Sequence, residues 1–453
     1  MKTVDKLLGK LNNFKNAKLF YYEHKFVTTE QFLDLKNQSV DKLNEIGIKP
    51  HSVVMVKGDI TPQTIALLLA CLQLNLIVVP CNVTDTETID TKIDIANVEF
   101  IIEAELITNK ELHFKIDKKQ PRKKVISLFS TLKNKLAPGL VLFTSGTSGQ
   151  PKAAVHNVNL LFKKFIGNGK TLKTIGFLLY DHWGGLNTIL YSLFNGGCII
   201  CLSKREPEYL CQLIEETGAE LLPVSPSFIN LLLASKALKK HDTSSLKIVT
   251  FGSEPMPQYT LNELKKVLPD VKLKQTYGLI EIGVLQTRST NTNSLFFELD
   301  KKEINYRVRN NILEIKTESA MLGYLNAKQP FTDDGWFITG DEVEVLGKEI
   351  RIIGRKSDII NVGGEKVYPL EVEAVLLKHE KVIDALVYGQ QNFLLGSIVC
   401  AKIYSTAHND TKVLKNEIIR FCRNLLKPYQ VPIKLELSTE PLHGNRLKKT
   451  RKF

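Results

Sequence analysis

Residues 140–157 read LVLFTSGTSGQPKAAVHN. The apolar run from Leu140 to Phe143 is typical of a buried strand. The next eight residues are all Thr, Ser, Gly, Gln or Pro, and Lys152 follows them. When such a loop joins a strand to a helix, its backbone N–H groups and hydroxyls surround a phosphate. We therefore expect a phosphate-binding loop that is followed by a helix.

The spacing in this loop excludes the Walker type, GxxxxGK[ST]. Counting from Gly146 places Pro151 where the second glycine is required. Ala153 then stands where the metal-binding hydroxyl belongs. The loop must belong to another class of phosphate site.

Length and composition indicate a globular chain with more than one domain. It has 453 residues, of which 43% are hydrophobic and 24% charged. The longest apolar stretch, residues 64–80, is interrupted by Gln73 and Asn75. It predicts a core helix followed by a buried strand and no membrane span. The first residues lack a signal peptide's apolar run, so we expect a cytoplasmic protein.

Cysteine usage and charge narrow the class further. Seven scattered cysteines predict reduced thiols, and the apolar surroundings of Cys198 and Cys201 favour core residues over a metal or redox pair. The net charge of +13 favours anionic partners such as nucleotides, phosphorylated cofactors and acidic carrier proteins. Basic and aromatic residues do not interleave, so no nucleic-acid partner is expected.

The order of apolar segments predicts an α/β fold. Strand-like and helix-like segments alternate from about residue 50 to 290, which indicates parallel sheets covered by helices. Shorter strands and turns follow, and the last hundred or so residues carry two further helices. We expect a large N-terminal domain, residues 1–354, of doubly wound sheets with a β-rich subdomain. A small α+β C-terminal domain, residues 355–453, follows.

The opening stretch closely resembles the phosphate loop of the adenylate-forming (AMP-binding) superfamily. This superfamily includes acyl-CoA synthetases, peptide-synthetase adenylation domains and luciferases. Further segments resemble its other motifs from about residue 50 to the end. They are DHWGGLNTIL (181–190), FGSEP (251–255), QTYGLIEIG (275–283), SAMLGYLN (319–326), GWFITGD (335–341) and GRKSDIINVGGEKVYPLEVE (354–373).

The resemblance assigns roles to named residues. Tyr277 would lie against adenine, Glu281 would hold Mg²⁺, and Asp341 and Arg355 would reach the ribose hydroxyls. The residues implied at the ATP phosphates are Thr144, Ser145, Gly146, Thr147, Ser148, Gly149 and Lys152. Those implied along the base and beside it are Gly252, Ser253, Glu254, Thr276 and Gly278.

The resemblance also implies a mobile C-terminal domain that rotates to admit a pantetheine thiol. Gly363 and Gly364 suit the close approach of that arm, because glycine lets the backbone run beside a ligand. The pivot would lie at Ser357, a position that is often Asp or Lys in the family. A second departure is Ile280, which replaces the hydroxyl residue usually found before the metal-binding glutamate.

The C-terminal motif departs most from the family pattern. Arg446 stands where the family has a glycine, and Leu447 stands where it has the catalytic lysine. A slip of one residue would let Lys448 serve, with Lys449 as the fallback. The alternative is that these lysines form a solvated basic tail.

The acid-binding pocket is less well defined by the resemblance, which points to His182 or Trp183, Val224, Ser225, Gly278 and Leu279. His182 favours an ordinary carboxylic acid. Asp181, one residue away, favours an amino acid, because amino-acid-activating relatives bind the α-ammonium through an aspartate in this segment.

The resemblance implies an acid:thiol ligase that uses ATP and Mg²⁺. Such an enzyme forms an acyl-adenylate from a small carboxylic acid. It then transfers the acyl group to coenzyme A or to the phosphopantetheine of an acyl carrier protein. Two alternatives remain open: an amino-acid-activating adenylation enzyme, and a degenerate homologue that binds nucleotide without ligase activity.

Overall fold

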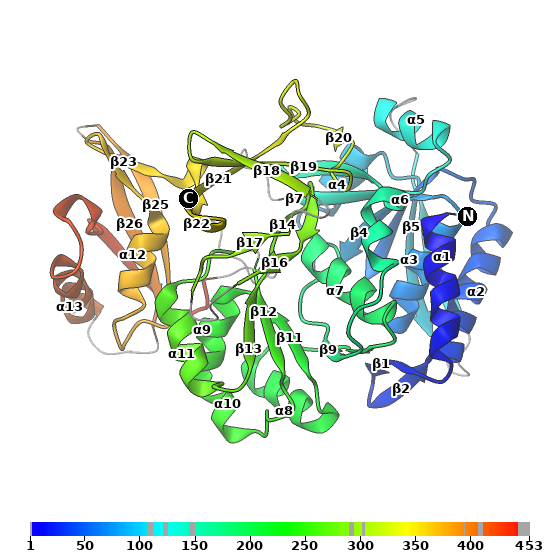
Figure 1. Ribbon diagram of the computed structural model, residues 1–453, viewed down its shortest axis with the longest axis horizontal. Coiled ribbons are helices and arrows are strands. Elements are labelled where there is room, and N and C mark those ends of the chain that lie inside the picture. The colour runs from blue at the N-terminus through cyan, green and yellow to red at the C-terminus, as the bar shows by residue number, and fades with distance from the viewer. Residues whose placement is uncertain are drawn as a thin grey trace.

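The structure is a computed structural model of the 453-residue chain. It describes residues 2–106, 112–120, 126–144, 150–252, 254–289, 294–300, 304–393, 395–405 and 411–442. A large α/β region is followed by a smaller unit formed by the last part of the chain (Figure 1). None of the helices within these ranges has the length and apolar character needed to cross a bilayer.

The strand that enters the predicted phosphate loop lies in the first of two large sheets. Seven described strands form this sheet in the order β20-β8-β7-β4-β3-β5-β6. Its centre is parallel, whereas β6, β8 and β20 pair antiparallel at the two edges. The bounds are β3 Val53–Gly58, β4 Ile77–Asn82, β5 Phe100–Leu106, β6 Leu112–Lys118, β7 Gly139–Thr144, β8 Lys152–Asn157 and β20 Gly323–Tyr324.

The second large sheet has the order β13-β12-β11-β9-β10-β1-β2 in the described residues. The pairs from β13 to β1 are parallel, and β2 turns back antiparallel to β1. The N-terminal segment thus completes a sheet whose other strands come much later in the chain. The bounds are β1 Lys18–Tyr22, β2 Lys25–Thr28, β9 Lys173–Ile175, β10 Cys198–Ile200, β11 Leu221–Val224, β12 Ile248–Phe251 and β13 Lys272–Gln275.

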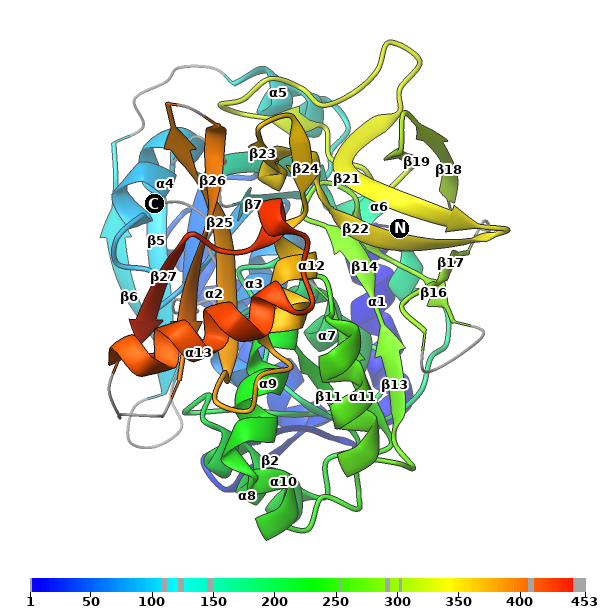
Figure 2. The same ribbon diagram turned by 90° about the vertical axis from the view of Figure 1, so that its left-hand side faces the viewer.

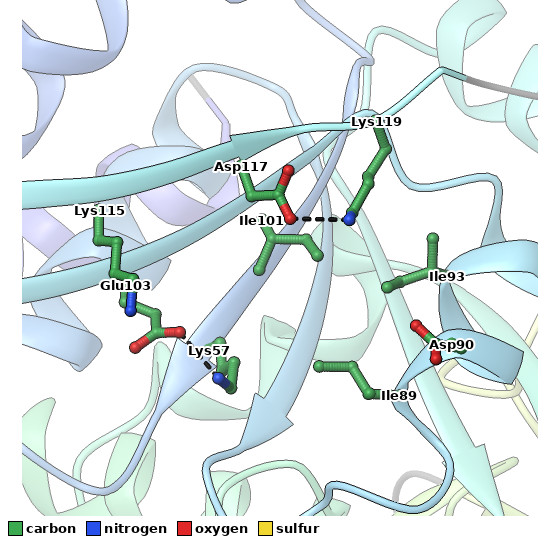
Figure 3. Close-up of a pocket in the computed structure, with 9 residues that line it drawn as sticks. All are labelled: Lys57, Ile89, Asp90, Ile93, Ile101, Glu103, Lys115, Asp117 and Lys119. Atoms are coloured by element: carbon green, nitrogen blue, oxygen red, sulfur yellow. Dashed lines mark hydrogen bonds and ion pairs between the residues drawn. The ribbon is translucent and has the colours of Figure 1, made fainter.

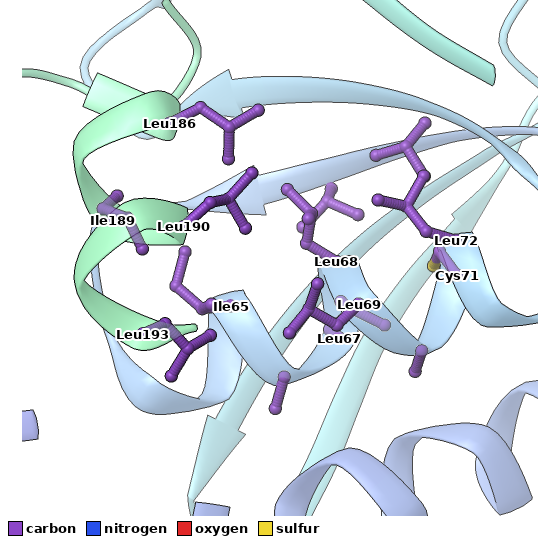
Figure 4. Packing of buried hydrophobic residues seen from close by; sticks show 14 of the residues in the cluster. Ile65, Leu67, Leu68, Leu69, Cys71, Leu72, Leu186, Ile189, Leu190 and Leu193 are labelled. Atoms are coloured by element: carbon purple, nitrogen blue, oxygen red, sulfur yellow. The ribbon is translucent and has the colours of Figure 1, made fainter. Parts of the chain in front are cut away.

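A layer of helices separates the two sheets. Val54 and Val56 of one sheet share a core with Phe20 and Ile199 of the other, because alternate strand residues point to the same face. Helices α3 and α7 lie at the centre of this core, with leucines of one against leucines of the other (Figure 4). Every residue from Pro62 to Leu72 is buried. Truncating one of these leucines to alanine would cost about 2–5 kcal/mol.

Local signals explain where several helices begin. The Thr61 hydroxyl accepts a 3.1 Å hydrogen bond from the Thr64 N–H, and Pro62 occupies the first turn of α3. Thr28 and Gln31 form a reciprocal capping box at the start of α2. The helices of this region are α1 Thr3–Leu11, α2 Thr29–Glu45, α3 Pro62–Gln73, α4 Ile89–Ala96, α5 Ser127–Asn134, α6 Val158–Leu161, α7 Trp183–Leu193, α8 Pro207–Thr217, α9 Pro226–Ser235, α10 Ala237–Lys240 and α11 Gln258–Val267.

A β-rich part follows the second sheet. Four described strands form an antiparallel sheet in the order β18-β19-β21-β22. Two short hairpins, β14-β15 and β16-β17, come before this sheet in the sequence. The bounds are β14 Tyr277–Leu279, β15 Gly283–Leu285, β16 Thr287–Arg288, β17 Glu298–Leu299, β18 Ile304–Arg309, β19 Ile312–Thr317, β21 Phe337–Leu346 and β22 Glu349–Arg355.

The last unit is a small sheet covered by two helices (Figure 2). Its strands have the order β24-β23-β26-β25, with β27 parallel to β26. Apolar residues of α12 and α13 share one core with this sheet. The bounds are β23 Ile360–Val362, β24 Glu365–Val367, α12 Pro369–Leu376, β25 Asp384–Asn392, β26 Gly396–Tyr404, α13 Thr411–Arg423 and β27 Lys434–Ser438.

The α/β class and the helix-then-strand reading of residues 64–80 are confirmed by α3 and β4. All seven cysteines are free and buried, and burial raises the pKa of Cys198 to about 11, which confirms the expected core thiols. The expected parallel pairing holds in the centre of both large sheets, and antiparallel strands complete their edges. Placing the domain boundary after residue 354 stays a prediction.

Candidate active site

The predicted phosphate loop joins two antiparallel strands. Thr144 ends β7, Lys152 begins β8, and the two residues are directly paired across the ladder. The expected helix after Lys152 is therefore wrong: residues 152–157 form a strand. Ser145, Gly146, Thr147, Ser148 and Gly149 lie outside the described residues.

The chain around β20 holds the far end of this loop in place. The N–H groups of Leu322 and Leu325 donate to the Val155 and Ala153 carbonyls over 2.7 and 2.9 Å. The side chain of Asn326 accepts from the Ala153 N–H at 3.0 Å and donates to the Pro151 carbonyl at 2.9 Å. The backbone on which Lys152 stands is thus paired on both sides.

The same segment also positions Glu281, the residue implied to hold a metal. The Met321 N–H donates to the Glu281 carbonyl over 2.7 Å. The Tyr324 hydroxyl donates to the Glu281 carboxylate, and both side chains are largely buried. Burial and the neighbouring Glu281 carboxylate raise the pKa of Tyr324 well above its usual value, so Tyr324 stays a donor. The Lys152 ammonium lies 5.7 Å from the centre of the Tyr324 ring.

Tyr277, Asp341 and Arg355 form a second polar group. The Tyr277 hydroxyl donates to Asp341 Oδ2 over 2.7 Å, and Arg355 Nε lies 3.3 Å from Asp341 Oδ1. Asp341 and Arg355 face each other across β21 and β22, which fixes their spacing. Burial, reinforced by Glu281, raises the pKa of Asp341, while Arg355 and Tyr277 oppose that rise. Glu281 and Asp341 are therefore close enough for the charge of Glu281 to affect the pKa of Asp341.

The segment implied to run along the base is closely packed. The Thr276 N–H donates to the Phe251 carbonyl over 2.8 Å, and its hydroxyl donates to the same oxygen over 3.1 Å. A Cβ on Gly252 would lie 2.4 Å from the Thr276 hydroxyl oxygen, so a side chain does not fit there. Glu254 accepts a 2.7 Å hydrogen bond from the Ser227 hydroxyl. Ser253 lies outside the described residues.

Most residues implied in the acid pocket lie at the ends of elements. Val224 is the last residue of β11, and the Ser225 hydroxyl caps α9 by accepting from the Phe228 N–H over 3.3 Å. His182 directly precedes α7. Trp183 is buried, with its ring stacked 6.1 Å from that of Phe162.

The short hairpin that follows Tyr277 carries the other implied pocket residues. Gly278 and Leu279 of β14 pair with Val284 and Gly283 of β15. A Cβ on Gly283 would lie 2.8 Å from the indole nitrogen of Trp183. This close packing brings the hairpin against the start of α7.

Asp181 has a partner that sequence reasoning missed. The Lys92 ammonium forms an ion pair with Asp85 and lies 3.9 Å from Asp181 Oδ2. The exposed fractions of these side chains are 1% for Lys92, 8% for Asp85 and 2% for Asp181. Lys92 lies on α4 and its ammonium is 5.5 Å from the ring centre of Phe143, directly before the phosphate loop. A protein ammonium therefore already faces the carboxylate that an amino-acid substrate would need.

Two glycines of the predicted site lie in the C-terminal unit. Gly363 and Gly364 form the turn between β23 and β24 with φ of +58° and +93°, a left-handed region that favours glycine. The Gly363 N–H donates to the Leu395 carbonyl over 2.8 Å. Lys448, Lys449 and Leu447 lie outside the described residues.

The carboxylates suit a nucleotide-bound metal better than a protein cage. No cluster of three or more His, Cys, Asp or Glu residues able to hold a metal occurs within the described ranges. Mg²⁺ commonly uses one or two carboxylates, with substrate phosphates and waters completing its shell. The single Glu281 carboxylate beside the phosphate loop fits that donor set.

A separate cavity of about 300 Å³ lies over β3, β5 and β6 beside α4 (Figure 3). Two ion pairs, Lys57–Glu103 at 2.8 Å and Lys119–Asp117 at 2.7 Å, lie in its wall. It shares no residue with the site described above. Its lining carries three lysines and three carboxylates, so it offers no net charge to a ligand.

Comparison with known proteins decides the family. The model for AMP-binding enzymes matches residues 10–305, and the model for the AMP-binding enzyme C-terminal domain matches residues 371–452. The chain belongs to the AMP-binding enzyme family. This membership confirms the resemblance to adenylate-forming enzymes on which the implied roles rest.

Curated relatives of this AMP-binding enzyme include CoA ligases. The 2-succinylbenzoate–CoA ligase of Bacillus cytotoxicus is 26% identical over 317 residues, which cover 64% of this chain and 64% of that protein. The 4-coumarate-CoA ligase 1 of Narcissus pseudonarcissus is 28% identical over 321 residues, which cover 62% and 57%. The matches thus span less than two thirds of the length of these relatives.

Solved structures of similar shape support the fold of this AMP-binding enzyme over its whole length. ATP-bound MatB from Rhodopseudomonas palustris matches with a TM-score of 0.80 at 19% identity, covering 100% of this chain and 97% of that one. The anthranilate CoA ligase AuaEII in complex with anthranoyl-AMP matches with a TM-score of 0.78 at 17% identity, covering 100% and 96%. Both likenesses confirm the α/β architecture with its small C-terminal unit.

Proposed function

We propose that the protein is an ATP-dependent acid:thiol ligase that forms an acyl-adenylate and transfers the acyl group to coenzyme A. The observation that carries the proposal is the grouping of Lys152 and Glu281 on Tyr324, with Asp341 held by Tyr277 close enough to Glu281 to feel its charge. The names of the curated relatives, which are CoA ligases, support the same reaction class.

In the first step, a carboxylate oxygen of the acid attacks the α-phosphorus of ATP. The bond to the bridging oxygen breaks, and pyrophosphate leaves. Lys152, Thr144 and the loop residues Ser145, Gly146, Thr147, Ser148 and Gly149 would stabilise the charge on the phosphates. Glu281 would hold Mg²⁺, which when bound supplies further charge stabilisation along the phosphates.

The polar group around Asp341 supports its proposed role at the ribose. A carboxylate offers about four acceptor positions. Tyr277 and Arg355 use one oxygen each in the structure, so Asp341 keeps capacity for two ribose hydroxyls. Arg355 would add a donor on the same side. Tyr277 would present its ring to adenine, with Gly252, Ser253, Glu254, Thr276 and Gly278 around the base.

In the second step, the sulfur of a thiol attacks the acyl carbonyl carbon, AMP leaves, and the thiol proton is released. The turn at Gly363 and Gly364 would accept the pantetheine arm, because these two residues carry no side chain of their own. Lys448 would be the C-terminal domain's lysine for adenylation. A carrier-protein pantetheine is the second candidate acceptor, and the positive net charge of +13 suits an acidic carrier.

The surroundings of Asp181 support one class of substrate over the other. The Lys92 ammonium lies 3.9 Å from the Asp181 carboxylate, and both side chains are buried. The ammonium of an amino-acid substrate would therefore have to compete with the Lys92 ammonium for this carboxylate. This supports a simple carboxylic acid over the amino-acid alternative, with His182, Trp183, Val224, Ser225 and Leu279 lining the acid pocket.

Pyrophosphate exchange into ATP tests the proposal. The purified protein would be given pools of aliphatic, aryl and amino acids, and a responding pool would be divided into single acids. We expect exchange with at least one simple acid and none with amino acids. ATP binding by calorimetry without exchange in any pool would contradict the proposal and favour the degenerate homologue. Exchange driven only by amino acids would favour the second alternative.

A further inference from the structure

Tyr324 occupies a position between two residues of the proposed machinery. It is the second residue of β20 and pairs with Ala154, two positions beyond Lys152 on β8. Its hydroxyl donates to the Glu281 carboxylate, and its ring centre lies 5.7 Å from the Lys152 ammonium. One side chain therefore touches the proposed metal-binding carboxylate at its tip and faces the proposed phosphate-binding ammonium with its ring.

The backbone of Tyr324 is held by a dedicated side chain. The Tyr324 N–H donates to Gln329 Oε1 over 2.8 Å, and Gln329 Nε2 donates to the Tyr324 carbonyl over 3.0 Å. With 8% of its surface exposed, the tyrosine has little freedom to turn away. Its ring and hydroxyl are thus fixed before any ligand arrives.

The two contacts differ in kind and can be separated. The bond to Glu281 is charge-assisted and directs one carboxylate oxygen, which leaves the remaining acceptor positions for another ligand. The ring contact with Lys152 is a cation–π interaction, which limits where the ammonium can lie. Removing the hydroxyl breaks only the first contact, and removing the ring breaks both.

Resting on the proposed function, we propose that Tyr324 is a positioning residue that fixes the Glu281 carboxylate and the Lys152 ammonium relative to each other for metal-bound ATP. The hydroxyl orients the carboxylate toward the metal, and the ring orients the ammonium toward the phosphates. Tyr324 itself forms no bond to ATP in this scheme.

The test compares Tyr324→Phe with Tyr324→Leu by calorimetry of ATP binding in Mg²⁺ and in EDTA. For Tyr324→Phe we expect the gain in ATP affinity that Mg²⁺ gives to fall by about 10- to 100-fold, the range for a lost hydrogen bond to a charged group. Affinity for AMP in EDTA should stay within about twofold, because the adenine and ribose contacts do not involve Tyr324.

Tyr324→Leu should lose a further factor of about 2 to 30 in ATP affinity even in EDTA, because the cation–π contact with Lys152 is gone. Tyr306→Phe is the matched control: it removes a hydroxyl that donates to the Lys348 carbonyl over 3.2 Å, away from the site. It should match the wild type in every arm.

In pyrophosphate-exchange assays, Tyr324→Phe should raise the Mg²⁺ concentration that gives the half-maximal rate. The factor of this rise should be larger than the factor by which kcat falls. A variant with unchanged Mg²⁺ dependence and unchanged calorimetry would overturn the inference. If Tyr324→Leu fails to fold, Gln329→Ala releases the backbone of Tyr324 and should move the same quantities in the same direction. If no acid drives exchange in the wild type, the proposed function fails while the calorimetric comparison still tests Tyr324.

Discussion

Asn230 on α9 donates a 3.3 Å hydrogen bond to Asp384 on β25, and both side chains are buried. Thr260 on α11 in turn donates to Asn230 over 2.8 Å. These bonds join the second large sheet's helices to the C-terminal sheet. The small unit is thus held in one orientation by polar contacts that must open if it rotates between the two proposed steps.

Replacing Asn230 should loosen this contact. Asn230→Ala leaves the buried Asp384 carboxylate with one donor fewer, at a cost of about 1.5–3 kcal/mol. We expect faster hydrogen exchange in α9 and β25 and a lower melting temperature. Asn262→Ala, which removes an exposed amide that accepts from Gln258 over 2.9 Å within α11, is the control. Equal exchange rates in both variants would show that the bond does not hold the unit.

Removing Lys92 should destabilise the protein strongly. Lys92→Met leaves Asp85 and Asp181 as buried charges without their ammonium, and the expected loss in the free energy of unfolding is about 3–5 kcal/mol. Lys240→Met breaks an exposed pair with Glu208 and should cost far less, because solvent screens a surface ion pair. Urea unfolding of both variants measures the difference. Similar losses would mean that the buried cluster contributes no more than a surface pair.

Stability should depend on pH through His156. Burial lowers the pKa of this imidazole to about 4, although the Ile280 and Ser319 carbonyls oppose the shift. Between the unfolded pKa near 6.5 and the folded value, the unfolded chain binds the extra proton. The folding stability that depends on neutral His156 is therefore fully present above about pH 6.5. It is lost as the pH falls toward 4, by up to about 3 kcal/mol.

His156→Phe should flatten this dependence between pH 6.5 and 4. Melting temperatures across that window, measured for both proteins, check the prediction. His241→Phe, at a partly buried imidazole whose pKa is raised by Glu215 and Glu208, should leave the slope from His156 in place. A His156→Phe protein with the wild-type slope would assign the acid sensitivity to other groups.

A side chain at residue 252 should impair nucleotide binding. The Cβ of Gly252→Ala would lie 2.4 Å from the Thr276 hydroxyl oxygen and 2.7 Å from the Thr276 carbonyl oxygen. The added Thr276→Ala change removes only the first contact, so the double variant should stay impaired. Gly167→Ala, where nothing lies within 4 Å of the new Cβ, is the control. Calorimetry with AMP measures the effect, and unchanged affinity in Gly252→Ala would remove this segment from the base-binding site.

Lys152→Ala and Glu281→Gln should each slow pyrophosphate exchange by about 100- to 1,000-fold, the usual effect of losing one preorganised electrostatic contact. Glu281→Gln keeps an oxygen that accepts from Tyr324, so the fold should be retained and melting should change little.

Lys448→Ala should also slow adenylation if the C-terminal motif is shifted by one residue. Normal adenylate formation in Lys448→Ala would refute that shift, and Lys449→Ala would then be tested.

Sequence patterns predicted the elements whose apolar runs are continuous. β3, β4 and β7 are buried on both faces, so their composition alone marks them as strands. The helix that usually follows a phosphate loop is absent here, since residues 152–157 form the strand β8. Their strand conformation is imposed by the ladders to β7 and β20.

Sequence patterns of this kind do not reveal contacts between residues that are distant in sequence. Lys92 reads as the polar face of a short amphipathic helix, yet it is buried between Asp85 and Asp181. Tyr324 reads as a turn residue beside a glycine, whereas its contacts come from Glu281 and Lys152. Motif resemblance named Glu281 and Lys152 individually, and only the fold brings them to one aromatic ring.

The pairing of β1 with β10 also has a consequence for biosynthesis. Phe20 and Ile199 are register partners, so the ribosome makes one long before the other. At about 5–20 residues per second, the interval is about 10 to 40 seconds. During that time the edge of β1 that later pairs with β10 has no partner strand in the nascent chain. Slower translation lengthens this exposure, and chaperones would contribute most to the yield of folded protein during it.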